Sequence, residues 1–238
     1  MRRRALLTAA LAAAAAHRVH AQGENAVDVA LVLAIDVSRS VTDDEAALQR
    51  NGYRAAMTDK TVLAAIAGGP AGAVAVTYFE WARFEFQEVL MPWTRIATVA
   101  DAQAWSDGLG AKPFQSQSWT SISGALTFGG QLLRSVPFTA TRSVIDVSGD
   151  GRNNNGPDTV PIRDALVAAG VTINGLPIIN RHPRFGRLEL DVDQFYRDNV
   201  IGGEGSFYIV AEDFSAFSEA IKRKLLQEIS GLPASRYG

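Results

Sequence analysis

Carboxyl and hydroxyl side chains alternate in a short segment that follows a long apolar run. Residues 27–35 are apolar except for Asp28, and they lead directly into Asp36-Val37-Ser38-Arg39-Ser40. Alternate residues of an extended chain point to one side, so Asp36, Ser38 and Ser40 can present a carboxylate and two hydroxyls together. Ligands that are all oxygen select a hard cation, of which Mg²⁺, Mn²⁺ and Ca²⁺ are the usual examples. The segment is therefore a candidate divalent-metal loop.

Two further segments carry oxygen ligands of the same kind. Ser148-Gly149-Asp150-Gly151 follows a predicted strand at 143–147, and its glycines allow the backbone to turn sharply beside Asp150. Thr120 precedes a predicted helix at 122–133, so its hydroxyl stands at the positive end of that helix. In open α/β sheets, ligands bind where the strands end and the strand order reverses. We therefore expect the three segments to meet at one edge of a sheet.

The elements that must position these segments are predicted from apolar periodicity and from helix start and stop signals. Strand patterns occur at 27–35, 73–79, 84–91, 143–147, 171–179 and 207–210. Helix patterns follow the capping box Thr42-Asp43-Asp44-Glu45 and recur at 99–109, 122–133, 158–169 and 214–229. Strands that alternate with helices imply an α/β fold with a doubly wound, mainly parallel sheet. The strand at 84–91 follows 73–79 too closely for a crossover helix, which makes it an antiparallel edge strand.

The amino-terminal residues predict export. Arg2-Arg3-Arg4 precedes an Ala-rich apolar stretch at 5–16, and Val19-His20-Ala21 is the small-residue pattern of a signal-peptide cleavage site. Residues 1–21 are thus a predicted signal peptide, and residues 22–238 a single domain of a periplasmic or secreted protein. No later segment offers roughly 18 consecutive apolar residues, so no membrane span is expected.

Composition argues against several classes of protein. Removal of the signal peptide takes away four arginines and no acid, which changes the formal net charge from −2 to −6 and disfavours nucleic-acid binding. Cysteine is absent, so the chain has neither disulfides nor a thiol nucleophile. His182 is the only histidine outside the signal peptide, and neither a Gly-x-Ser-x-Gly elbow nor a zinc-type cluster of His and acids accompanies it. We therefore predict that the chain is not an enzyme.

The three oxygen-rich segments together resemble a known site. Asp-x-Ser-x-Ser after an apolar strand, Thr before an Ala- and Leu-containing helix, and Asp-Gly after a later strand are similar to the metal-ion-dependent adhesion site of von Willebrand factor A (vWA) domains. The resemblance spans residues 27–229 and implies a Rossmann-like vWA fold. It also implies that Ser38 and Ser40 bind the metal directly, Thr120 directly or through water, and Asp36 and Asp150 mostly through water or as orienting acceptors.

A narrower resemblance rests on the segment Tyr78-Phe79-Glu80-Trp81, the Ser-Gly-Asp-Gly turn and residues 195–228. These features are similar to an uncharacterised, exported bacterial branch of the vWA family, the DUF1194-like proteins. One departure from the vWA pattern concerns the second acidic loop, where Gly149 stands in place of the usual Thr and Asp146 lies inside the strand. Asp146 is either an outer acceptor near the metal or a buried carboxylate bound to a backbone amide, and the second interpretation is favoured.

Several residues near the proposed ligands have two interpretations. Trp119 is either an exposed contact for a partner or an aromatic lid packed over the following helix. The run Arg152-Asn153-Asn154-Asn155-Gly156 is most simply a turn, with a rim loop over the metal as the functional alternative. Arg39 and Arg152 flank the ligands and could add cationic contacts to such a rim. Glu80 is interpreted as a surface acid or a member of a salt bridge rather than as a ligand.

These features favour a metal-dependent binding module. If the direct ligands are mainly neutral hydroxyls, the ion keeps most of its positive charge and an exchangeable position, and it attracts a carboxylate from outside. We therefore predict a protein or peptide partner that presents Glu or Asp to Mg²⁺, Mn²⁺ or Ca²⁺. Two alternatives remain open, which are a metal-assisted hydrolase acting on an anionic small molecule and a structural envelope protein with a degenerate site.

Overall fold

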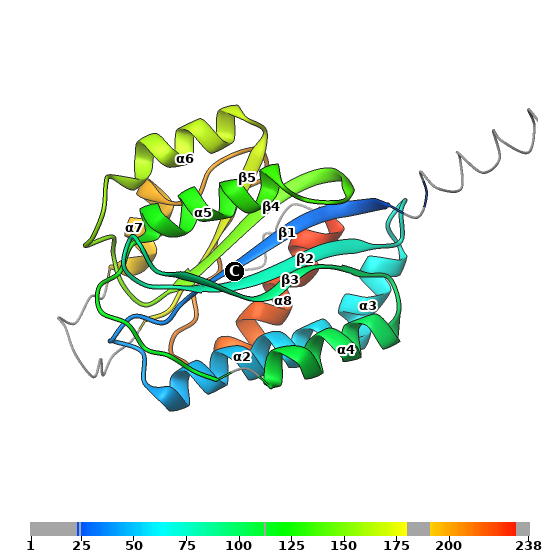
Figure 1. The fold of residues 1–238 in the computed structure, drawn as a ribbon, viewed down its shortest axis with the longest axis horizontal. Helices are drawn as coiled ribbons and strands as arrows, with labels where there is room; N and C mark the ends of the chain where they lie inside the picture. The colour runs from blue at the N-terminus through cyan, green and yellow to red at the C-terminus, as the bar shows by residue number, and fades with distance from the viewer. Residues whose placement is uncertain (1–22, 24, 112, 180–190, 232–238) are drawn as a thin grey trace, which may run out of the picture.

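The computed structural model describes residues 23, 25–111, 113–179 and 191–231. Within them five strands form one sheet in the order β3-β2-β1-β4-β5, with helices on both faces (Figure 1). The strands are β1 (Ala26–Asp36), β2 (Val74–Trp81), β3 (Gln87–Ile96), β4 (Thr139–Gly149) and β5 (Val171–Pro177). The helices are α2 (Asp43–Met57), α3 (Lys60–Ala67), α4 (Val99–Gly110), α5 (Ile122–Arg134), α6 (Thr159–Ala168), α7 (Val192–Asn199) and α8 (Phe217–Ser230). The predicted signal peptide and His182 lie outside the described residues.

Strand pairing confirms the predicted doubly wound α/β sheet. β1 pairs in parallel with β2 and with β4, and β4 pairs in parallel with β5, whereas β3 runs antiparallel to β2 at the sheet edge. In Figure 1, helices α5, α6 and α7 lie above the sheet and α2, α3, α4 and α8 lie below it. The chain leaves β1 for the lower layer and leaves β4 for the upper layer. The two strands are neighbours, so the topological switch point lies between their carboxyl ends.

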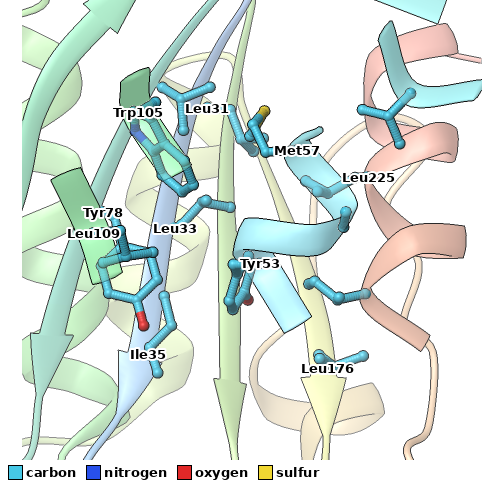
Figure 2. Packing of buried hydrophobic residues seen from close by; sticks show 14 of the residues in the cluster. Leu31, Leu33, Ile35, Tyr53, Met57, Tyr78, Trp105, Leu109, Leu176 and Leu225 are labelled. Carbon is cyan, nitrogen blue, oxygen red and sulfur yellow. The ribbon is translucent and has the colours of Figure 1, made fainter. Parts of the chain in front are cut away.

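The central strand β1 is buried on both faces, which explains why its sequence is a nearly continuous apolar run. Leu31, Leu33 and Ile35 point toward the lower helices, where they pack with Tyr53 of α2 and Tyr78 of β2 (Figure 2). The two tyrosine rings meet edge to face, with centroids 5.5 Å apart. Such packing fixes the direction in which β1 ends, and therefore the position of the loop that follows it.

The observed secondary structure differs from the predicted elements at one strand and two helical segments. The predicted strand at 207–210 is not a regular strand, since its one bridge is the isolated pairing of Tyr208 with Gly175 of β5. The next bridge, between Ile178 and Ala211, lies just beyond both segments. Helix α7 was not predicted, and the helical segment predicted after Thr42 is divided into α2 and α3. Within the described ranges, no helix has the length and apolar character required to cross a bilayer.

Candidate metal centre

The loop after β1 is a compact turn that holds its two serines together. The backbone N–H of Ser38 donates to Asp36 Oδ1 at 2.7 Å, and the hydroxyl oxygens of Ser38 and Ser40 lie 3.1 Å apart. Helix α2 starts directly afterwards with the predicted capping box, in which Thr42 N–H donates to Glu45 Oε2 at 2.7 Å and Glu45 N–H donates to Thr42 Oγ1 at 3.2 Å. Strand and helix therefore constrain the loop from both ends.

The loop after β4 meets the β1 loop through a direct hydrogen bond. Ser40 Oγ donates to Asp150 Oδ1 at 2.6 Å, although the two residues are 110 positions apart. Gly149 allows Asp36 and Tyr196 to lie close to the β4 loop. A Cβ atom at position 149 would lie 2.8 Å from Asp36 Oδ2 and 3.0 Å from the Tyr196 hydroxyl oxygen. The departure from the vWA pattern thus has a structural reason, since Asp36 and Tyr196 of α7 occupy the space that a side chain would need.

Thr120 lies in a third loop that is fastened beside the other two. The backbone N–H of Gln117 donates to Val37 O at 3.1 Å, and that of Ser121 donates to Ala82 O at 2.7 Å, which ties the loop to the ends of β1 and β2. Thr120 is buried, and Ser121 caps α5 by accepting a hydrogen bond from Gly124 N–H at 3.1 Å. These contacts place Thr120 at the same edge of the sheet as the two serines.

Three consecutive asparagines hold the loops in this arrangement. Asn154 Oδ1 accepts from Thr120 N–H at 2.9 Å, while Asn154 N–H donates to Thr120 O at 2.9 Å. Asn153 Oδ1 accepts from Ser123 N–H at 3.0 Å, and Asn155 Oδ1 accepts from Phe84 N–H at 2.8 Å. Neither the simple turn nor the rim loop predicted from the sequence includes this role, in which the asparagine side chains bind backbone N–H groups of other segments. The sequence signal was the run of short side-chain acceptors after a strand end.

The pKa of the Asp36 carboxyl is strongly perturbed by its surroundings. The carboxyl is fully buried, and burial raises its pKa well above the ordinary value; the nearby charge of Asp150 raises it further, against hydrogen bonds from Ser38. Asp36 Oδ2 has no hydrogen-bond partner among the described residues. Burial also raises the pKa of the Tyr196 hydroxyl, and the negative charges of Asp36 and Asp150 raise this pKa further. A positive charge at this position would relieve the unfavourable burial of two carboxylates.

The chemistry of the donor set fits a hard cation that binds through hydroxyls. The described part of the chain holds no group of three or more His, Cys, Asp or Glu side chains arranged for a metal. A cation at this edge would therefore need the hydroxyls of Ser38, Ser40 and Thr120 beside Asp36 and Asp150. These are the five residues that the sequence predicted as ligands, and their role stays a prediction. Tyr196, which lies beside Asp36 and Gly149, was not anticipated, because its helix carries no signal that connects it to these loops.

Asp146 is a buried carboxylate, as the favoured interpretation held, but its partner is a lysine side chain rather than a backbone amide. Its side chain points to the lower helices, where Lys224 Nζ lies 2.6 Å from Asp146 Oδ1 and 2.5 Å from Glu228 Oε1. It is therefore neither an outer acceptor of the metal site nor bound to a backbone amide. Asp146 and Asp150 are an even number of residues apart, but β4 ends at Gly149, so strand alternation does not place their side chains on the same side of the sheet. Asp36 faces Tyr196 on the upper side of the sheet, and Asp146 faces α8 on the lower side.

The remaining predicted residues lie near the site in different roles. Glu80 is in a salt bridge, as one interpretation held, but a buried one, since Arg50 Nε and Nη2 donate to its two oxygens at 2.7 and 2.9 Å. Arg152 pairs with Asp191. Trp119 is 60% exposed, which excludes a packed aromatic lid. Arg39 is exposed between the two serines.

Comparison with known proteins places this chain in a family. Residues 26–233 match the family described as "Protein of unknown function (DUF1194)". The chain belongs to this family. No curated protein sequence matches the DUF1194 chain.

Solved structures show that this DUF1194 chain has a vWA-like fold. Proximal thread matrix protein 1 from the mussel byssus, "with zinc occupied MIDAS motif", has a TM-score of 0.60 at 14% identity, covering 86% of this chain and 48% of that one. A von Willebrand factor type A structure from Catenulispora acidiphila has a TM-score of 0.54 at 13% identity, covering 86% and 43%. The pilus adhesin SpaC from Lactobacillus rhamnosus GG has a TM-score of 0.59 at 14% identity, covering 85% and 30%. The chain thus spans about half or less of the length of these proteins.

Proposed function

We propose that the chain is a metal-dependent protein-binding module that acts outside the cytoplasm. In this proposal a divalent cation, Mg²⁺ or Mn²⁺, binds at the edge formed by the ends of β1 and β4. Ser38 and Ser40 bind it directly, Thr120 binds it directly or through water, and Asp36 and Asp150 act mainly through water. The observation that carries the proposal is the meeting of two serine hydroxyls with a buried pair of carboxyls.

The charge of this donor set explains what the ion would do. Hydroxyl ligands are neutral, so an ion held mainly by them remains electrophilic and keeps a position open for an anionic ligand. A Glu or Asp side chain from a partner protein completes the octahedral coordination that Mg²⁺ requires. A zinc-occupied site in the mussel protein and the adhesin SpaC among the similar structures support a binding role for this fold.

Thermal unfolding with added metal tests the site. A cation that binds only the folded chain stabilises it by about 2.7 kcal/mol at a hundred times the dissociation constant. For a domain of this size the melting temperature should rise by roughly 5 to 11 °C. Asp36→Asn should abolish the rise, because it removes a charge while keeping an oxygen that can accept from Ser38.

Asp28→Asn is the matched control. Asp28 is also a buried carboxyl of β1, but it lies at the opposite end of the strand and accepts from Ala71 N–H at 2.9 Å. This variant should respond to metal like the wild type even if its baseline stability is lower. An equal response of the wild type and Asp36→Asn would show that the metal binds elsewhere.

A further inference from the structure

We propose that Trp119 is a second contact point for the partner, beside the metal. Its indole would pack against a large apolar side chain that stands within about three residues of the partner's acidic residue. This inference rests on the proposed function, since it concerns the same interface.

The backbone of Trp119 has an unfavourable conformation for a residue with a side chain. Its φ of +70° makes it the single non-glycine residue with positive φ in the described part of the chain. This region is unfavourable for residues with a Cβ, and a bulky residue there is an outlier. The side chain is 60% exposed, so packing inside the molecule does not compensate for the strain. Strained residues of this kind cluster at functional sites.

The neighbours of Trp119 hold it in this conformation. Gln117 is bound to the end of β1 and Ser121 to the end of β2. Between them, the backbone N–H of Thr120 donates to the side chain of Asn154, and the backbone N–H of Asn154 donates to the carbonyl of Thr120. The chain has to turn within the short span between these anchors, and Trp119 takes the unusual backbone angle. The indole is therefore presented by a fixed backbone, and little conformational entropy is lost when a partner binds it.

The charges around Trp119 select the kind of side chain that it contacts. Trp119 is adjacent in sequence to Thr120, a proposed ligand of the ion, so the indole lies beside the metal site. When an acidic residue of the partner binds the ion, the residues next to it in the partner chain therefore lie close to the indole. An aromatic face accepts either an apolar group or a cation. Here the divalent ion and the exposed Arg39 both carry positive charge, and Arg39 follows Ser38, which is bridged to Gln117 two residues before Trp119. This positive charge disfavours a cation. A large apolar side chain remains as the favoured contact.

A pair of substitutions separates the backbone of Trp119 from its indole. Trp119→Ala removes the indole and keeps the strained backbone, whereas Trp119→Gly removes the indole and relieves the strain. Trp119→Gly should therefore melt at a higher temperature than Trp119→Ala. Neither variant should change the concentration of Mg²⁺ required for half-maximal thermal stabilisation, because neither removes a metal ligand.

Selection of peptides tests the binding role with a defined probe. A phage-displayed library of random 12-residue peptides is panned on the purified chain with Mg²⁺ and eluted with EDTA. We expect the eluted peptides to combine Glu or Asp with a large apolar residue within three positions. Panning on Trp119→Ala should retain the acid and lose the apolar preference. The best peptide, when synthesised, should bind both Trp119 variants at least about tenfold more weakly, whereas Val99→Ala should bind like the wild type.

Val99 is a suitable control because it is exposed and apolar, like Trp119. It lies at the start of α4, just after the end of β3, which pairs with the start of β2 and is therefore at the other end of the strands from the proposed metal site. Peptides that carry the acid but bind Trp119→Ala within twofold of the wild type would overturn the role of Trp119 and leave the metal-bridged function standing. Failure to obtain any peptide whose binding depends on Mg²⁺ and Asp36 would overturn both proposals.

Discussion

Replacing Asp146 by Asn should flatten the pH dependence of stability between about pH 4 and pH 7. Asp146 lies beside Lys224 and Glu228, and all three are buried. Burial raises the pKa of Asp146 from 3.8 to about 7, with a further contribution from the charge of Glu228 and an opposing one from Lys224. Between these pH values the folded chain keeps a proton that the unfolded chain has released. The free energy of unfolding therefore falls as the pH rises, and the loss is complete above pH 7.

The size of the effect follows from the two pKa values. Each pKa unit corresponds to about 1.4 kcal/mol, so the ionisation of Asp146 should lower the free energy of unfolding by about 4 kcal/mol between pH 4 and pH 8. Asp146→Asn has no carboxyl to ionise and should lack this component. Lys224 keeps a partner in the variant, because Glu228 Oε1 lies 2.5 Å from its Nζ and itself accepts from Asn174 Nδ2 at 2.9 Å.

Urea denaturation across this pH range, in the presence of EDTA, measures the effect without a contribution from metal binding. Asp28→Asn removes a buried carboxyl that accepts from Ala71 N–H rather than pairing with Lys224, and this variant should retain the slope of the wild type. If Asp146→Asn loses stability with rising pH as steeply as the wild type, the charge assignment of the buried cluster is wrong.

Three further predictions concern the site and its processing. Gly149→Ala forces a methyl group against the carboxyl of Asp36, and we expect a loss of about 1 to 3 kcal/mol in stability together with weaker Mg²⁺ binding in a thermal titration. Asn154→Ala leaves the backbone N–H of Thr120 without its acceptor, at a cost of about 1 to 3 kcal/mol, while Asn154→Asp retains an acceptor oxygen and should lose less. Equal losses in the two Asn154 variants, measured by urea denaturation, would show that the hydrogen bond from Thr120 N–H to the Asn154 side chain does not stabilise the loop. Amino-terminal sequencing of the protein from its native compartment should begin at Gln22, and an intact Met1 would contradict the predicted export.

The architecture and the candidate ligands could be predicted from the sequence alone. The apolar run of β1, the capping box at Thr42 and the oxygen-rich segments depend on residues within a few positions of each other, so their patterns are visible without a structure. The close succession of the second and third strands also indicated the antiparallel edge, because a crossover helix needs more residues. The loops met as expected because parallel strands end at the same edge of the sheet.

The contacts that join these candidate ligands to distant parts of the chain could not be predicted from the sequence and are visible only in the folded structure. The hydrogen bond from Ser40 to Asp150, the clamp of Asn154 on Thr120 and the approach of Tyr196 to Gly149 each join distant segments. The pairing of Asp146 with Lys224 depends on which face of β4 is covered by α8. Local periodicity carries no information on such pairings, since they are fixed by how turns end the alternation of a strand and by how helices pack across the sheet.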